Sequence, residues 1–99
     1  PYQIDKLGAI ADLAWINESE LVLGSEDRDM LHHVRIEKNQ ASILRSTACP
    51  VDERDTLISS PNGKCLCLNH NSSPIPLLVK MDQFDRIIKV RRGRSWFPR

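Results

Sequence analysis

The stretch LISSPNGKCLCL, from Leu57 to Leu68, decides the fold class of this chain. Its two ends are short apolar runs, and Pro61, Asn62 and Gly63 lie between them. Asn followed by Gly accepts the positive φ angles that a tight hairpin turn requires. The stretch therefore predicts an antiparallel β-hairpin.

Similar short apolar runs recur along the chain every eight to twelve residues or so, which is the spacing of strands in antiparallel folds. Glu20–Ser25 is rich in β-forming residues, and Met30–Ile36 alternates a mainly apolar face with a more polar one. Residues 38–40 make a turn from that run into Ala41–Ser46. A strand over Leu77–Met81 begins only after two prolines, because proline cannot donate to a sheet ladder. We expect a mainly-β fold, a small antiparallel sheet domain built of short hairpins.

Two segments fit a helix as well as a strand. Asp5 suits the N-cap of a helix over residues 6–16, but Leu13 and Trp15 in that segment also alternate as strand residues do. Residues 83–90 show the same ambiguity. An α+β fold with helices near 6–16 and 83–90 is therefore the alternative.

The length, composition and charge of the chain indicate how many domains it forms and how they are arranged. Its 99 residues suit one domain, and a composition of 40% hydrophobic and 27% charged residues excludes a disordered chain. The formal net charge of +1 hides an asymmetry, since the last 20 residues hold seven Lys and Arg against two Asp. We expect one mainly-β domain at 1–90 and a basic, flexible tail at 91–99. No apolar run approaches the roughly 20 residues that cross a bilayer.

Cysteine usage indicates a reducing compartment. The three cysteines form an odd number, which argues against a disulfide framework, and the first residues lack the pattern of a secretion signal. We expect free thiols and an intracellular location, cytoplasmic or nuclear.

The metal-ligand candidates are Cys65, Cys67 and His70, because zinc binds thiolate and imidazole. A Cys-x-Cys spacing is uncommon at structural zinc sites, and the same cysteines also suit small buried side chains of a hairpin strand. We therefore expect no bound metal and no cofactor.

No catalytic motif is visible in the sequence. The serines lack the Gly-x-Ser-x-Gly context of a nucleophile elbow, and the four glycines stand too far apart for a phosphate-binding loop. We therefore expect no catalytic residues and no enzymatic activity.

The stretch IADLAWINESELVLGSEDRDMLHHVRI, from Ile10 to Ile36, contains an apolar strand ending in Trp, a Leu-x-x-Gly-Ser strand and an acidic turn. This order resembles one blade of a β-propeller of the WD-repeat type. A weaker echo at Thr56–Leu68, about 46 residues later, extends the resemblance over Ile10 to Leu68. The resemblance implies a rigid binding platform with no chemistry of its own. Because a closed propeller needs about four to eight blades, it also implies a piece of a larger chain or assembly. The matching residues are Ile10, Leu13, Trp15, Leu21, Gly24, Ser25 and Asp27.

The segment RIIKVRRGRSWFPR, from Arg86 to Arg99, interleaves arginines with two aromatic residues. Guanidinium groups bind carboxylates and phosphates, and exposed aromatic rings anchor protein interfaces or stack on bases. An ordinary strand with solvent-facing Arg and Lys has a similar composition. We expect a non-enzymatic interaction module that binds an acidic protein partner through this surface, with a nucleic-acid-binding domain contacting phosphates as the alternative. The expected contact residues are Arg86, Lys89, Arg91, Arg92, Arg94, Trp96 and Phe97.

Overall fold

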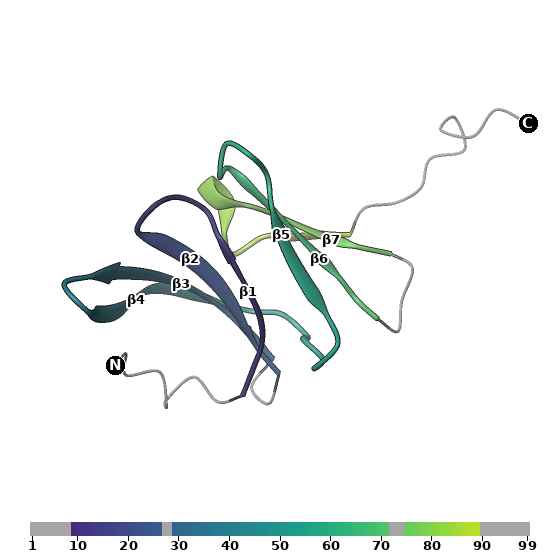
Figure 1. Ribbon diagram of the computed structural model, residues 1–99. Coiled ribbons are helices and arrows are strands. Elements are labelled where there is room, and N and C mark those ends of the chain that lie inside the picture. Colours follow the sequence, from purple (N-terminus) through teal and green to yellow (C-terminus); the bar gives the residue numbers. More distant parts are fainter. Residues whose placement is uncertain (1–8, 27–28, 72–74, 90–99) are drawn as a thin grey trace, which may run out of the picture.

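The computed structural model describes residues 9–26, 29–71 and 75–89, which form two four-stranded antiparallel sheets (Figure 1). Each sheet is a meander whose strands pair in chain order. The mainly-β prediction is confirmed. The first sheet comprises β1 (Ile10–Trp15), β2 (Glu20–Ser25), β3 (Met30–Glu37) and β4 (Gln40–Ala48). The second comprises β5 (Thr56–Ser59), β6 (Cys65–Asn69), β7 (Leu77–Lys80) and β8 (Ile87–Lys89), with the 3-10 turn η2 (Met81–Gln83) before β8.

The α+β alternative is wrong over the part of the chain that the structure describes. Within the segment 6–16, residues 10–15 form β1, which pairs with β2. Within 83–90, the chain leaves η2 and enters β8, which pairs with β7. The local sequence of these segments fits a helix and a strand equally well, and pairing with a neighbouring strand selects the strand. No helix in the described ranges is long and apolar enough to cross a membrane.

Residues with positive φ form the hairpin turns. Lys38 and Asn39 have φ of 50° and 64°, as a two-residue hairpin loop of the I′ type requires. In the β5–β6 connection only Gly63 is left-handed, with φ of 70°. A Cβ atom on Gly63 would lie 2.1 Å from the carbonyl oxygen of Ile16, so the turn also packs against the first sheet. The predicted hairpin is confirmed, and its glycine serves the sheet–sheet contact as well.

The two sheets stack with their first strands side by side. Figure 1 shows β1 beside β5, with the remaining strands of each sheet spreading away from this pair. The Asp12 carboxylate accepts a 2.8 Å hydrogen bond from the Leu57 amide, and the Ser59 hydroxyl donates a 2.7 Å bond to the Trp15 carbonyl. The earlier residue of β1 contacts the earlier residue of β5, and the later contacts the later, so β1 and β5 run in the same direction. The second sheet thus repeats the orientation of the first.

Residue pairing repeats between the sheets with an offset of 44 or 45 residues. Trp15, Leu21, Val34 and Ile43 are paired neighbours across β1–β4. The equivalent row across β5–β8 is Ser59, Leu66, Val79 and Ile87, and Leu13 and Leu23 correspond likewise to Leu57 and Leu68. Most of these equivalent positions carry the same residue type, so the faint sequence echo corresponds to a repeat in the structure.

The main core lies between the two sheets and contains buried residues from both. Burial of such aliphatic and aromatic side chains stabilises by roughly 25 cal/mol per Å² of apolar surface. A smaller cluster of Leu21, Leu23 and Val34 lies on the other face of the first sheet. The central strands of the first sheet are therefore buried on both faces, and Leu31–Val34 is buried throughout rather than alternating as the sequence suggested. The main core comprises Ala14, Val22, Leu31, Cys49, Val51, Leu57, Leu66, Leu68, Leu77, Val79 and Phe84.

Candidate interaction site

Two of the predicted contact residues, Arg86 and Lys89, lie at the two ends of the short region around β8. Both are exposed, and within the described ranges neither forms an ion pair. Because β8 pairs with β7 alone among the described strands, it is an edge strand whose outer side is open to a partner. The other predicted residues, Arg91, Arg92, Arg94, Trp96 and Phe97, lie outside the described residues.

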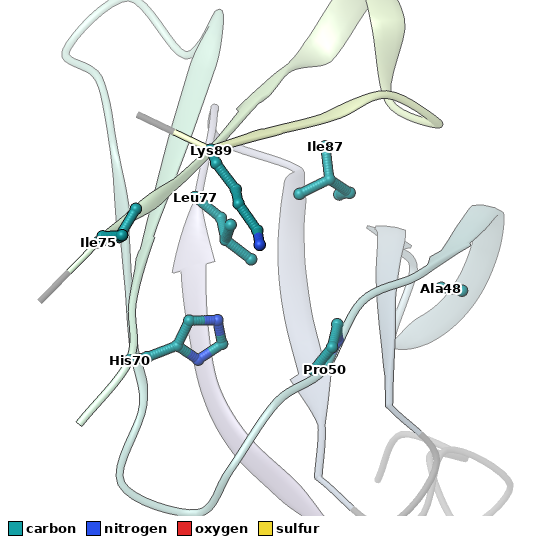
Figure 2. A pocket seen from close by; sticks show the side chains of 7 residues that line it. All are labelled: Ala48, Pro50, His70, Ile75, Leu77, Ile87 and Lys89. Carbon is teal, nitrogen blue, oxygen red and sulfur yellow. The ribbon is translucent and has the colours of Figure 1, made fainter. Parts of the chain in front are cut away.

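A hollow of about 420 Å³ opens between the two sheets beside β8 (Figure 2). Its lining is mostly apolar, and the Lys89 side chain points into it, so the hollow places one cationic head above an aliphatic surface. That arrangement follows from register: Lys89 pairs with Leu77, and Ile87 pairs with Val79, so these residues share the face that looks toward the first sheet. The lining residues are Ala48, Pro50, His70, Ile75, Leu77, Ile87 and Lys89.

His70, at one side of this hollow, is held by a buried carboxylate. Its Nδ1 lies 2.6 Å from Oδ2 of Asp55, whose side chain is fully buried. Asp55 also accepts bonds from the amides of Asp52 and Asn71, at 2.9 and 3.0 Å. Burial alone would raise the pKa of Asp55, but these backbone bonds and His70 together hold it below its ordinary value. The pair fixes the β6–β7 turn to the start of β5 and orients the imidazole beside the hollow.

The cysteine and histidine candidates do not converge on a metal site. Cys65 and Cys67 share the face of β6 that is turned away from the first sheet, whereas His70 is engaged by Asp55 beyond the strand end. Cys49 is buried elsewhere in the main core, and all three cysteines are free. In the described ranges, no three His, Cys, Asp or Glu residues are grouped so that they could hold a metal ion.

A second polar network joins the sheets at the opposite end of β7. His33 Nε2 lies 2.6 Å from Glu20, and Arg45 donates to Nδ1 of His33 at 3.0 Å. The Arg45 guanidinium also lies 4.8 Å from the ring centroid of Phe84 and donates to the Met81 carbonyl. Burial, which is the largest effect, and the charge of Arg45 lower the pKa of His33, and they outweigh the hydrogen bond to Glu20, which raises it. A neutral His33 therefore serves to position Arg45 against the second sheet.

Sequence reasoning missed the hollow and both polar networks. The contacts that join the elements link residues far apart in the chain, such as His33 with Arg45, 12 residues apart, and Arg45 with Met81, 36 residues apart, and no local motif joins them. The available signal was the repeat, since Leu21, Val34 and Ile43 recur as Leu66, Val79 and Ile87. That pattern would have predicted two stacked sheets and hence a space between them.

Comparison with models of protein families and with curated proteins finds no match to this chain.

Proposed function

We propose that this chain is a non-enzymatic interaction module in which two propeller-type blades present a basic, apolar-lined hollow to an acidic protein partner. The observation that carries the proposal is the position of Lys89, whose amine projects over Leu77 and Ile87. A peptide carboxylate would pair with the amine, while a neighbouring aliphatic side chain would fill the hollow. Charge-assisted bonds of this kind are stronger than neutral ones, and anchors in desolvated pockets dominate interface energetics.

The blade assignment rests on the repeated register and on the shared direction of β1 and β5. Four-stranded antiparallel meanders that stack in one orientation, first strand beside first strand, are the arrangement of propeller blades. The spacing of 44 or 45 residues also falls near the period typical of such repeats. These features support a rigid platform in which rims and inter-sheet spaces bind partners.

A protein partner suits the described surface better than a nucleic acid. The hollow presents one amine over aliphatic side chains, which complements an apolar residue beside an acid. Nucleic-acid binding uses rows of cations along phosphates and aromatic stacking platforms. Within the described ranges, the residues lining the hollow include neither. Arg86 is a second exposed cation next to β8, but it does not line the hollow, so Lys89 carries the proposed charge contact.

The test is a calorimetric titration with a short peptide containing Leu between two Glu residues, against the same peptide with Gln in place of Glu. The native chain should prefer the acidic peptide, and Lys89→Ala should weaken binding by about tenfold, since about 1.4 kcal/mol corresponds to a factor of ten. Lys38→Ala, which removes a cation from the β3–β4 turn, is the matched control and should bind as the native chain does. Equal binding of both peptides, or an unchanged Lys89→Ala variant, would contradict the proposal.

A parallel titration with mixed-sequence oligonucleotides at two salt concentrations examines the rival partner. Phosphate binding loses affinity steeply as salt rises, because condensed counterions are released on binding. Tight oligonucleotide binding with a steep salt slope, alongside weak peptide binding, would replace the acidic protein with a nucleic acid.

A further inference from the structure

The face of the first sheet that is turned away from the second sheet is mainly apolar, and we name it face 1; its polar residues include His32 and Ser46, whose side chains lie 2.6 Å apart in a hydrogen bond. It contains Trp15, Leu21, Val34 and Ile43, which pair with one another in a row across the four strands. Leu13, two residues before Trp15 in β1, lies on the same face. Leu21 and Val34 in the middle of the row are buried, whereas Trp15 and Ile43 at its ends are each 49% exposed. Half-exposed large apolar side chains that continue a buried cluster are typical of an interaction surface.

The face of the second sheet that is turned away from the first sheet is also apolar, and we name it face 2. Its central row runs across all four strands as Ile58, Cys67, Leu78 and Ile88. Ile58 is 56% exposed and Ile88 is 39% exposed. Exposed apolar side chains thus lie across face 2, and on face 1 they lie at Leu13, Trp15 and Ile43, around a middle that is buried.

The repeat identifies what these faces resemble. Face 1 carries Leu13, Leu21 and Val34 at the positions where the second sheet carries Leu57, Leu66 and Val79. Those three residues of the second sheet are buried in the main core against the first sheet. Because the sheets have the same orientation, face 1 is equivalent to the buried side of the second sheet.

Face 2 is equivalent, by the same reasoning, to the buried side of the first sheet. Ile58 and Cys67 stand at the positions of Ala14 and Val22, both of which belong to the main core. Leu78 stands at the position of His33. Face 2 is more apolar than the buried side of the first sheet, because it carries Leu78 where that side carries His33 and its polar network.

We infer that a second copy of this chain docks head to tail, with its face 1 on face 2 of the first copy, and so repeats the sheet stacking found within one copy. The interface between copies would repeat the contact between the two sheets of one copy. Face 1 would contact a sheet as the buried side of the second sheet does, and face 2 as the buried side of the first sheet does. Because the two contacting surfaces differ, the contact is heterologous and leaves a free face at each end for further copies. Trp15 and Ile58 would lie at the interface, where large apolar side chains supply most of the binding energy. The inference rests on the blade repeat used in the proposed function but not on binding of an acidic partner.

The test uses sedimentation velocity over a concentration series of the native chain and two variants, Trp15→Glu on face 1 and Ile58→Glu on face 2. The native chain should form dimers and larger species as concentration rises. Each variant alone should remain a monomer, because a charge buried in an apolar interface is costly. An equimolar mixture of the two variants should form a dimer and nothing larger, since the mixture retains one intact face 1 and one intact face 2.

Leu44→Glu is the matched control for the added charge. Leu44 is 41% exposed and lies beside Arg35 and Ser42, away from the row containing Ile43, so this variant should associate as the native chain does. Circular dichroism and thermal unfolding of every variant establish that the fold is intact.

A native chain that stays monomeric at millimolar concentration would overturn the inference, as would self-association of Ile58→Glu through face 1 alone. Titration of Trp15→Glu with the acidic peptide separates the two proposals, because this variant should bind the peptide normally whether or not copies associate.

Discussion

The hydroxyl of Ser59 donates a 2.7 Å hydrogen bond to the carbonyl oxygen of Trp15, its equivalent one sheet earlier in the chain. With the Asp12–Leu57 bond, this contact aligns β1 and β5 in one direction and gives the two sheets the same orientation. The small Ser59 side chain lies where the first sheet carries an indole. The chain thus has a small side chain where the second sheet meets the first, and a large, half-exposed apolar side chain at the equivalent position on face 1.

Removing the Ser59 hydroxyl should weaken this junction. We expect Ser59→Ala to lower the free energy of unfolding by about 1 kcal/mol, the usual net value of one hydrogen bond. Ser42→Ala, at an exposed position of β4, should change it by less than about 0.5 kcal/mol. Urea denaturation of the three proteins measures both values, and equal effects of the two substitutions would contradict the importance of the junction.

Gly63→Ala should destabilise the fold more strongly. Its φ of 70° disfavours any side chain, and the new Cβ would lie 2.1 Å from a backbone oxygen of the first sheet. We expect a loss of at least about 2 kcal/mol in unfolding free energy.

Gly24→Ala provides the comparison, because the nearest atoms to its Cβ would be side-chain methyls and not backbone, with Val51 Cγ1 at 3.0 Å the nearest of them. Thermal and chemical denaturation should rank Gly63→Ala well below Gly24→Ala in stability. The reverse order would show that the β5–β6 turn does not pack on the first sheet.

Acidification should reveal the contribution of Asp55. Its pKa in the folded state lies below the ordinary value of 3.8, so the unfolded chain binds the proton more readily. The stability that Asp55 contributes is therefore complete above this ordinary value and declines as the pH falls through it toward the lower pKa of the folded state.

Asp55→Asn should lose about 1–3 kcal/mol at neutral pH through unmatched buried hydrogen bonds. Its unfolding free energy should also depend less on pH between about 5 and 2 than that of the native chain. Denaturant titrations at a series of pH values measure both effects, and parallel pH curves for the two proteins would exclude the predicted role.

The thiols should differ sharply in reactivity. Burial, reinforced by Asp55 and Asp29, raises the pKa of Cys49 to about 11, and this side chain is 1% exposed. Cys65 and Cys67 lie on face 2 and are partly exposed. Because the thiolate is the reactive form, a maleimide at pH 8 should label these two residues first and Cys49 only after unfolding. Mass spectrometry of a labelling time course identifies the order, and early labelling of Cys49 would contradict the described core.

The sequence predicted the hairpins well because turn chemistry is local. Lys38 and Asn39 adopt the positive φ values expected of a connection between two strands, and Gly63 does so in the second sheet. Helix and strand were harder to separate at Ala11–Trp15, since apolar residues lie on both faces of β1: Ala11 and Ala14 pack on the main core, and Leu13 and Trp15 lie on the other face. Pairing with β2 settles the matter in the structure.

The candidate site was predicted only in part. Local composition identified Arg86 and Lys89 as exposed cations near the end of the chain, but not the hollow into which Lys89 points. That hollow depends on the angle between two sheets and on Ala48 and Pro50, which approach it from the first sheet. Contacts such as His70 with Asp55 join residues that no sequence motif links.

The measurement that addresses the proposed function most directly is an amide-resolved NMR titration of the chain with the acidic Leu-containing peptide. The proposal predicts saturable shifts at Ile75, Leu77, Ile87 and Lys89, together with His70, all of which line the hollow. Shifts restricted to β1–β4, or no shifts at saturating peptide, would contradict it.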